Sequence, residues 1–567
     1  MRHSIRTPLV MLLVLVSSLI GLQGQDRTSG KSFATRSEVI ARNGMVATNH
    51  PLATQIGIEV LKKGGSAIDA AIAANAFLGL ADPGMNGIGG DLFAIVWDAK
   101  TEKLYGLNAS GKSPGKMTIE HLRAAKERGE TILQGPLSVT TPGCVDGWFE
   151  LHERFGKLAF EKLLSPTIQY AREGVAITQE TADIFERMEE SIQQEDNPTF
   201  KEVYFEDNKF PRKGEIFRNP DLANTLEIIA DKGHDGFYKG QIASRIEAHF
   251  KQRGAFLSKQ DLAKHSSIWV EPVSINYRGY DIWEIPPPGQ GMSALQILNI
   301  LEGFDMGQMR FGSSEHIHHF VEAKKLAYED LAKYYGDPEF GDIPMETLLS
   351  KEYANDRRKL INSNKAGEYY PGLESGDHTI YLTVADKDGN MVSFIQSLSS
   401  IFGSKEVPQG LGFPLQNRGG TGFILEEDHI SVYAPNKRPF HTIIPAFVTK
   451  DGKPFISFGL MGGDMQPQGH AQMILNLIDF GMNLQEAGDA PRIRHTGTVI
   501  WNGHVKGVGS TYLESGFDYE TISELMDKGH NIRMGKGMYG GYQAIMLKDG
   551  VYYGASESRK DGQAAGY

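Results

Sequence analysis

The sequence has little cysteine and little excess of basic charge. Its single thiol, Cys144, cannot form a disulfide within the chain and excludes a metal cluster held by several thiolates. We expect it to be a buried structural thiol rather than a nucleophile. The chain has 58 Lys and Arg against 70 Asp and Glu, a formal net charge of −12. Nucleic acids and anionic membranes favour basic partners, so the charge argues against both.

Long apolar runs are absent beyond the first residues. Arg2 and Arg6 precede an apolar stretch over 9–22, with no acidic residue before Asp26. A basic start followed by a short apolar core is typical of a secretory signal, which we predict over residues 1–24. The protein is therefore expected to be exported, either periplasmic or extracellular. An uncleaved N-terminal anchor is the alternative.

The rest of the chain has an ordinary globular composition, with 40% hydrophobic and 23% charged residues. Helical spacing is predicted over 56–80, interrupted at Gly64 and Gly65, and the middle of the chain, about 115–340, is mainly helical. Strands are expected at 91–98, 103–107, 379–385 and 391–397, with glycine-rich strand-turn units at 410–425, 440–463 and 541–556. No linker separates the helix-rich part of the chain from the strand-rich part, which favours one large α+β domain.

Two apparent motifs do not support a function. Residues 106–113 match the phosphate-loop pattern, but Pro114 follows where that site needs the first turn of a helix. His316, His318 and His319 with Glu322 could be drawn as a metal site. However, no further ligand follows this segment at a spacing typical of metal sites. We therefore interpret these histidines as surface or core-edge residues and predict no metal site. A G-x-S-x-G nucleophile elbow is also absent, which argues against an α/β-hydrolase.

Two other features suggest hydrolytic chemistry. Thr379 begins a predicted strand after a stretch rich in Gly and Ser. The pair Gly462 and Gly463 could present bare backbone N–H groups to an oxyanion, because glycine allows close approach and unusual φ angles.

Several stretches in the same order resemble one family. They are Gly44–Thr54, Gly64–Ala71, Asn86–Asp91, Thr379–Gly389, Phe402–Gly403, Pro435–Pro439, Gly462–Gly463 and Gly554–Arg559. With these motifs the chain resembles the γ-glutamyltranspeptidases (glutathione hydrolases), which are N-terminal-nucleophile hydrolases. The resemblance implies a four-layer αββα sandwich.

The resemblance also implies self-cleavage between His378 and Thr379. It would yield a large subunit, 25–378, and a small subunit, 379–567, that stay associated in one domain. Thr379 would act as nucleophile and, through its new N-terminal amine, as base. By the same resemblance Ser397 would hydrogen-bond the nucleophile, and Gly462 and Gly463 would form the oxyanion hole. This chemistry requires no cofactor and no metal.

The residues that grip the glutamyl group in the family differ here. Ser110 replaces an arginine, Ser399 replaces an asparagine, and His441 and Thr442 replace paired serines. The segment 415–421 also departs from the family pattern, and Arg418 within it could supply a relocated contact to a carboxylate. This combination is similar to the cephalosporin-acylase-like branch of the family.

The sequence therefore predicts an autoprocessing amidohydrolase acting on γ-glutamyl amides such as glutathione. Its expected partners are a small amide substrate, a water or amine acceptor, and its own two subunits, but no nucleic acid. A first alternative is an acylase of the same fold acting on glutaryl or other acyl amides. A second is a non-catalytic secreted binding protein on this scaffold.

Overall fold

The structure, a computed structural model, describes residues 31, 33–369, 378–497 and 507–567. The predicted signal segment, 1–24, lies outside these residues. None of the helices they form is long and apolar enough to cross a membrane.

Two antiparallel sheets form the centre of the molecule. Within the described residues each has seven strands. The first runs in the order β19 (Gln563–Gly566), β2 (Met45–Thr48), β10 (His378–Ala385), β11 (Met391–Ser399), β3 (Asp91–Asp98), β4 (Lys103–Ala109) and β7 (Ile268–Val270). The second runs in the order β1 (Val39–Ala41), β18 (Val551–Ser556), β17 (Gly541–Lys548), β13 (Lys453–Met461), β12 (Ala446–Lys450), β9 (Tyr280–Glu284) and β8 (Val273–Tyr277).

The sheets pack face to face around an apolar core. Phe93 and Tyr381 from the first sheet share this core with Phe447 and Ile545 from the second. Trp97 stacks on Phe447 with ring centroids 6.5 Å apart. Strands from both sides of residue 378 interleave in each sheet, so a cut at that point would leave the core shared between two pieces.

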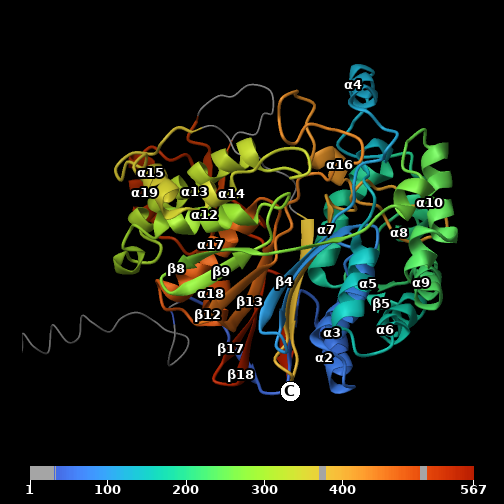
Figure 1. The fold of residues 1–567 in the computed structure, drawn as a ribbon, viewed down its shortest axis with the longest axis horizontal. Coiled ribbons are helices and arrows are strands. Elements are labelled where there is room, and N and C mark those ends of the chain that lie inside the picture. The colour runs from blue at the N-terminus through green and yellow to red at the C-terminus, as the bar shows by residue number, and fades with distance from the viewer. Residues whose placement is uncertain (1–30, 32, 370–377, 498–506) are drawn as a thin grey trace, which may run out of the picture.

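Helices cover the outer face of each sheet (Figure 1). Over the first sheet lie α2 (Pro51–Lys62), α3 (Ala67–Ala81), α5 (Cys144–Phe155), α6 (Phe160–Glu173), α7 (Gln179–Gln193), α8 (Pro198–Tyr204), α9 (Pro220–Tyr238), α10 (Gln241–Gln252) and α11 (Lys259–Ala263). Over the second lie α12 (Gly291–Leu301), α13 (Ser314–Tyr334), α15 (Lys351–Arg358), α17 (Met465–Ile478), α18 (Leu484–Asp489) and α19 (Tyr519–Asp527). The predicted four-layer αββα sandwich is confirmed.

Smaller elements complete the fold. They are α4 (Ile119–Glu127), α14 (Met345–Leu348), α16 (Arg418–Thr421), the pair β5 (Val175–Ala176) and β6 (Ile216–Phe217), and a small sheet of β14 (Ile493–Thr496), β15 (Ser510–Leu513) and β16 (Ile532–Met534).

Local sequence signals account for several boundaries. The predicted break at Gly64 is confirmed: this glycine has a φ of 92° and ends α2, and Ser66 then caps α3. The strands predicted at 379–385 and 391–397 are also confirmed: they form β10 and β11, which pair as a hairpin across a turn in which Gly389 has a φ of 90°.

The prediction of a strand-turn unit at 410–425 was wrong. This segment forms a loop and the short helix α16. Gly410 and Gly412 both have positive φ angles, which interrupt an extended strand. The backbone N–H of Gln416 donates instead to the carbonyl of Gly89 at 2.9 Å, so the loop is anchored beside the start of β3.

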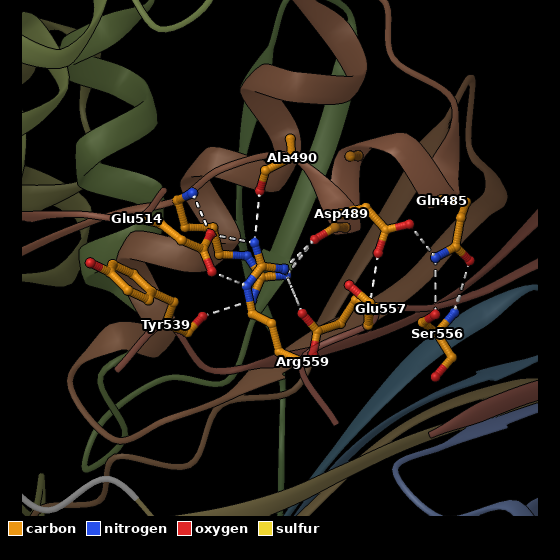
Figure 2. A network of polar contacts seen from close by, with 12 residues as sticks. Gln485, Asp489, Ala490, Glu514, Tyr539, Ser556, Glu557 and Arg559 are labelled. Atoms are coloured by element: carbon orange, nitrogen blue, oxygen red, sulfur yellow. Dashed lines mark hydrogen bonds and ion pairs between the residues drawn. The ribbon is translucent and has the colours of Figure 1, made fainter. Parts of the chain in front are cut away.

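The C-terminal motif, 554–559, is held by a polar network (Figure 2). Arg559 forms ion pairs with Glu514 at 2.5 Å and with Glu557 at 2.6 Å. The buried Arg492 lies 3.3 Å from the same Glu557 carboxylate. These contacts fix the end of β18 against α18 and the small sheet, so we assign this motif a structural part rather than a chemical one.

Candidate active site

Thr379 lies at the start of the central strand β10. Its side chain is fully buried. The pairing with β11 changes register here, since His378 pairs with Ser399 but Ile380 pairs with Gln396. This irregularity sets Thr379 apart from the regular ladder. The side-chain amide of Gln466, in the first turn of α17, donates to Thr379 Oγ at 3.4 Å.

Ser397 and Ser399 occupy the end of β11 that lies opposite Thr379. Ser399 has a φ of 79°, a left-handed conformation that is unusual for a residue with a side chain. Its N–H donates to Ser397 Oγ at 2.8 Å, and its hydroxyl contacts Thr421 Oγ at 2.7 Å. The structure thus places both predicted serines beside the candidate nucleophile. The hydrogen bond predicted from Ser397 to it stays a prediction.

Gly462 and Gly463 form the turn between β13 and α17. Their φ angles are 120° and 54°. A Cβ added at Gly462 would lie 3.1 Å from the Cα of Gly540, so both the conformation and the space favour glycine. The Gly462 carbonyl accepts from the N–H of Met465, and the Gly463 carbonyl accepts from that of Gln466. Both carbonyls are thus engaged by α17, and the predicted use of the two N–H groups as an oxyanion hole stays a prediction.

Two glutamines that sequence reasoning missed join the parts of this site. Gln290 is buried, and its amide donates to the carbonyls of Thr442 at 2.7 Å and Gly463 at 2.8 Å. Gln466 accepts from the N–H of Ile444 at 3.1 Å while it reaches Thr379. A glutamine directly after a Pro-Pro-Gly turn was the available signal for Gln290, and the position just after Gly-Gly-Asp was the signal for Gln466.

Arg418 provides a buried positive charge next to Thr442, the residue whose carbonyl accepts from Gln290. Its Nη1 donates to Thr442 Oγ at 3.1 Å. Its Nε and Nη2 are buried and have no hydrogen-bond partner among the described residues. Burial lowers the pKa of Arg418 to about 10, which leaves the guanidinium charged at neutral pH. A buried charged group with two unused donors is suited to bind an anion.

His441 and Asp91 complete the polar surroundings of Arg418. Burial, helped by the charges of Arg418 and Arg438, lowers the pKa of His441 well below its ordinary value. The ring is therefore neutral, and neither of its nitrogens has a partner within the described part of the chain. Burial raises the pKa of Asp91 to about 7, against the opposing charge of Arg418. Asp91 also pairs through its backbone with Ser397, which connects this group to the end of β11.

Ser110 follows directly after β4. Its hydroxyl donates to Asn108 Oδ1 at 2.6 Å, and its carbonyl accepts from Arg438 Nε at 3.3 Å. These two hydrogen bonds hold the loop that contains Ser110 in place. The predicted contact of Ser110 with substrate stays a prediction.

The features that the sequence discounted have structural explanations. Residues 110–118, all of them described, form no helix, and Lys112 of the apparent phosphate loop pairs with Glu339 at 2.6 Å. Cys144 is buried at the start of α5, and burial raises the pKa of its thiol well above the ordinary value. Both agree with the sequence-based interpretation. The interpretation of His316, His318 and His319 as surface or core-edge residues was wrong, because all three are buried on α13.

The family model described as "Gamma-glutamyltranspeptidase" matches residues 53–567, which includes every part of this site. The chain belongs to the gamma-glutamyltranspeptidase family. The predicted family is confirmed, and with it an N-terminal-nucleophile amidohydrolase with the threonine nucleophile characteristic of the family.

Individual relatives include both branches considered above. The chain is 37% identical to the glutathione hydrolase-like YwrD proenzyme of Bacillus subtilis, over 93% of this chain and 99% of the relative. It is 34% identical to the glutathione hydrolase proenzyme of Escherichia coli, over 93% of each. The crystal structure of a cephalosporin acylase from Bacillus halodurans superposes with a TM-score of 0.86, at 41% identity over 96% of this chain and 99% of that one.

Proposed function

We propose that the chain is an exported proenzyme that cleaves itself before Thr379 and then transfers the acyl group of a carboxylate-bearing amide through that residue. The observation that carries the class of acyl donor is the buried guanidinium of Arg418, which contacts Thr442 and has two N–H donors without a partner among the described residues. Gln290 joins Thr442 to Gly463. Export is supported by the basic and apolar character of residues 1–24.

The first reaction is an intramolecular cleavage. Thr379 Oγ attacks the carbonyl carbon of His378, and the acyl group moves from nitrogen to oxygen to give an ester. Water then hydrolyses this ester, which leaves a carboxylate on His378 and a free amine on Thr379. The register change at Thr379 supports this step, because the residue stands outside the regular ladder that would otherwise protect the bond.

The second reaction uses the new N-terminus. The free amine, with a reference pKa of about 7.7–8.0, accepts the proton of Thr379 Oγ as the oxygen attacks the donor carbonyl. The N–H groups of Gly462 and Gly463 stabilise the oxyanion, and the ammonium returns its proton to the leaving amine. Water or a second amine then resolves the acyl-enzyme. Gln466 positions the threonine hydroxyl in this scheme.

In this proposal Arg418 binds the acyl donor at the end of its acyl group that lies away from the reacting amide. A carboxylate there would accept from Nε and Nη2 and satisfy both buried donors. The γ-glutamyl group of glutathione carries such a carboxylate and is our first candidate. Glutaryl amides carry one too, and the replacement of the paired serines by His441 and Thr442, with the likeness to a cephalosporin acylase, favours them as the second candidate.

One gel with N-terminal sequencing tests the enzyme proposal. We expect the purified chain to give two bands, the smaller beginning at Thr379, and Thr379→Ala to give a single uncut and inactive band. A persistent wild-type band near the full 62.5 kDa would instead support the non-catalytic binding protein. A donor panel of γ-glutamyl, glutaryl and uncharged acyl amides with one common leaving group then identifies the acyl group.

A further inference from the structure

A cluster of metal-binding side chains lies away from the active site. His318 and Glu322 lie one turn apart on α13, and His530 lies in the loop between α19 and β16. One ligand atom from each falls within 4.8 Å of the others. His318 and Glu322 are fully buried, and His530 is 4% exposed. The third ligand that local spacing did not supply therefore comes from 212 residues further along the chain.

The hydrogen bonds fix which histidine nitrogens face the cluster. His318 Nε2 lies 2.8 Å from the carbonyl of Asn362 and must donate to it, so its Nδ1 carries the lone pair. That Nδ1 lies 2.7 Å from His530 Nε2. A ligand histidine that donates its other N–H to a backbone carbonyl is the common arrangement in metal sites.

Glu322 has room for a further ligand interaction. One of its oxygens accepts from Lys325 Nζ at 2.7 Å, and the other accepts from the N–H of Gly367 at 3.0 Å. The hydroxyl of Tyr369 also hydrogen-bonds this carboxylate. A carboxylate has about four lone-pair positions, so about one remains. The positive charge of Lys325 repels a bound cation. The change in cation affinity when this charge is removed therefore reports how close to Glu322 the cation binds.

We propose that His318, Glu322 and His530 form a zinc site. Two imidazoles and one carboxylate are ligands that zinc accepts in tetrahedral sites, with the fourth position open to water. Zinc–nitrogen bonds of about 2.0–2.1 Å put the two nitrogens about 3.4 Å apart, so the rings must separate by about 0.7 Å. His530 lies outside helix and strand, and zinc binding requires its ring to move by this amount. On binding, its proton shifts from Nε2 to Nδ1, and the ring stays neutral.

The ion would join α13 to the loop that follows α19. These lie on opposite sides of residue 378, so after the cleavage proposed above a bound zinc would bridge the large and small subunits. Binding itself does not require cleavage. A failure to bind zinc and a failure to process are therefore separate results, and the uncut Thr379→Ala chain is expected to bind as the wild type does.

The test is calorimetric titration with zinc of a chain without an affinity tag, after treatment with a chelator. We expect one equivalent per chain for the wild type and for the matched control His319→Gln, a neighbouring histidine on the same helix. His318→Ala and His530→Gln should bind at least about 100-fold more weakly, which is more than the loss of a residue behind a ligand costs. Lys325→Met should bind about ten-fold more tightly, because it removes an opposing charge.

Cobalt(II) gives an independent readout, since a tetrahedral site produces intense visible bands that both histidine variants should lose. Uptake below one equivalent by the wild type overturns the proposal. So does unchanged affinity in His530→Gln, a substitution in an irregular loop that should leave the fold intact. Unchanged affinity in Lys325→Met would remove Glu322 from the ligand set and overturn the three-residue site.

Discussion

Replacing Arg418 is the sharpest test of how the donor is held. Among the described residues, the guanidinium has two donors without a partner, Nε and Nη2, and each charge-assisted hydrogen bond to a carboxylate contributes about 1.5–3 kcal/mol. Together they give about 3–6 kcal/mol, or a loss of roughly 150- to 25,000-fold in kcat/KM. We choose Arg418→Met, because methionine keeps much of the apolar stem and removes the charge.

The assay compares two donors that share one leaving amine. One donor carries a carboxylate at the far end of its acyl group, and the other carries a methyl group in its place. For Arg418→Met we expect the full loss with the first donor and less than about three-fold change with the second. Arg418→Lys is the matched control: it keeps the charge but loses the paired donors, so its loss should be intermediate.

An equal loss with both donors would contradict this reasoning, because it would mean that Arg418 supports the fold of the site rather than the carboxylate. An unchanged KM and kcat with the carboxylate donor would contradict it as well. Autoprocessing offers an internal check of folding, since cleavage before Thr379 uses no donor and should proceed in both variants.

Three further predictions concern positioning, stability and pH. Gln290→Ala removes the two hydrogen bonds, of about 1 kcal/mol each, that join the carbonyl of Thr442 to that of Gly463. In steady-state kinetics kcat should therefore fall about 10- to 30-fold, with little change in KM. Arg559→Met removes the ion-pair partner that Glu514 has among the described residues and leaves Glu557 with Arg492 alone, so it should lower the free energy of unfolding by about 3–5 kcal/mol, measured by urea denaturation. Arg128→Met, which breaks an exposed pair, should cost less than about 1 kcal/mol. Burial lowers the pKa of His50 to about 4 in the folded state, so between pH 6.5 and 4 the unfolded chain takes up a proton there that the folded chain does not. As the pH falls through this window, the stability of the wild type relative to His50→Gln should therefore fall by up to about 1.4 kcal/mol per pH unit, and a constant difference between the two in urea titrations would contradict the shift.

The sequence predicted the elements whose signals are local. The hairpin of β10 and β11 was recognisable because two apolar runs flank a short turn with Gly389, and the break between α2 and α3 was recognisable from Gly64. The segment 410–425 misled this reasoning. Its glycines resemble those of strand turns, but its backbone bonds go to a distant loop near Gly89. No local pattern encodes that partner.

What the sequence by itself determined is the family, because short motifs follow one another in a fixed order along the chain. The layered fold, and the roles predicted for Thr379, Gly462 and Gly463, followed from that resemblance. Only the tertiary structure decided that Gln290 ties the glycine turn to Thr442, that Arg418 keeps two donors unused, and that His530 reaches His318. The physical reason is that burial and hydrogen-bond partners arise between residues hundreds of positions apart. The type of a residue says which hydrogen-bond donors and acceptors it has. Its packed surroundings decide which of those donors and acceptors remain available to a ligand.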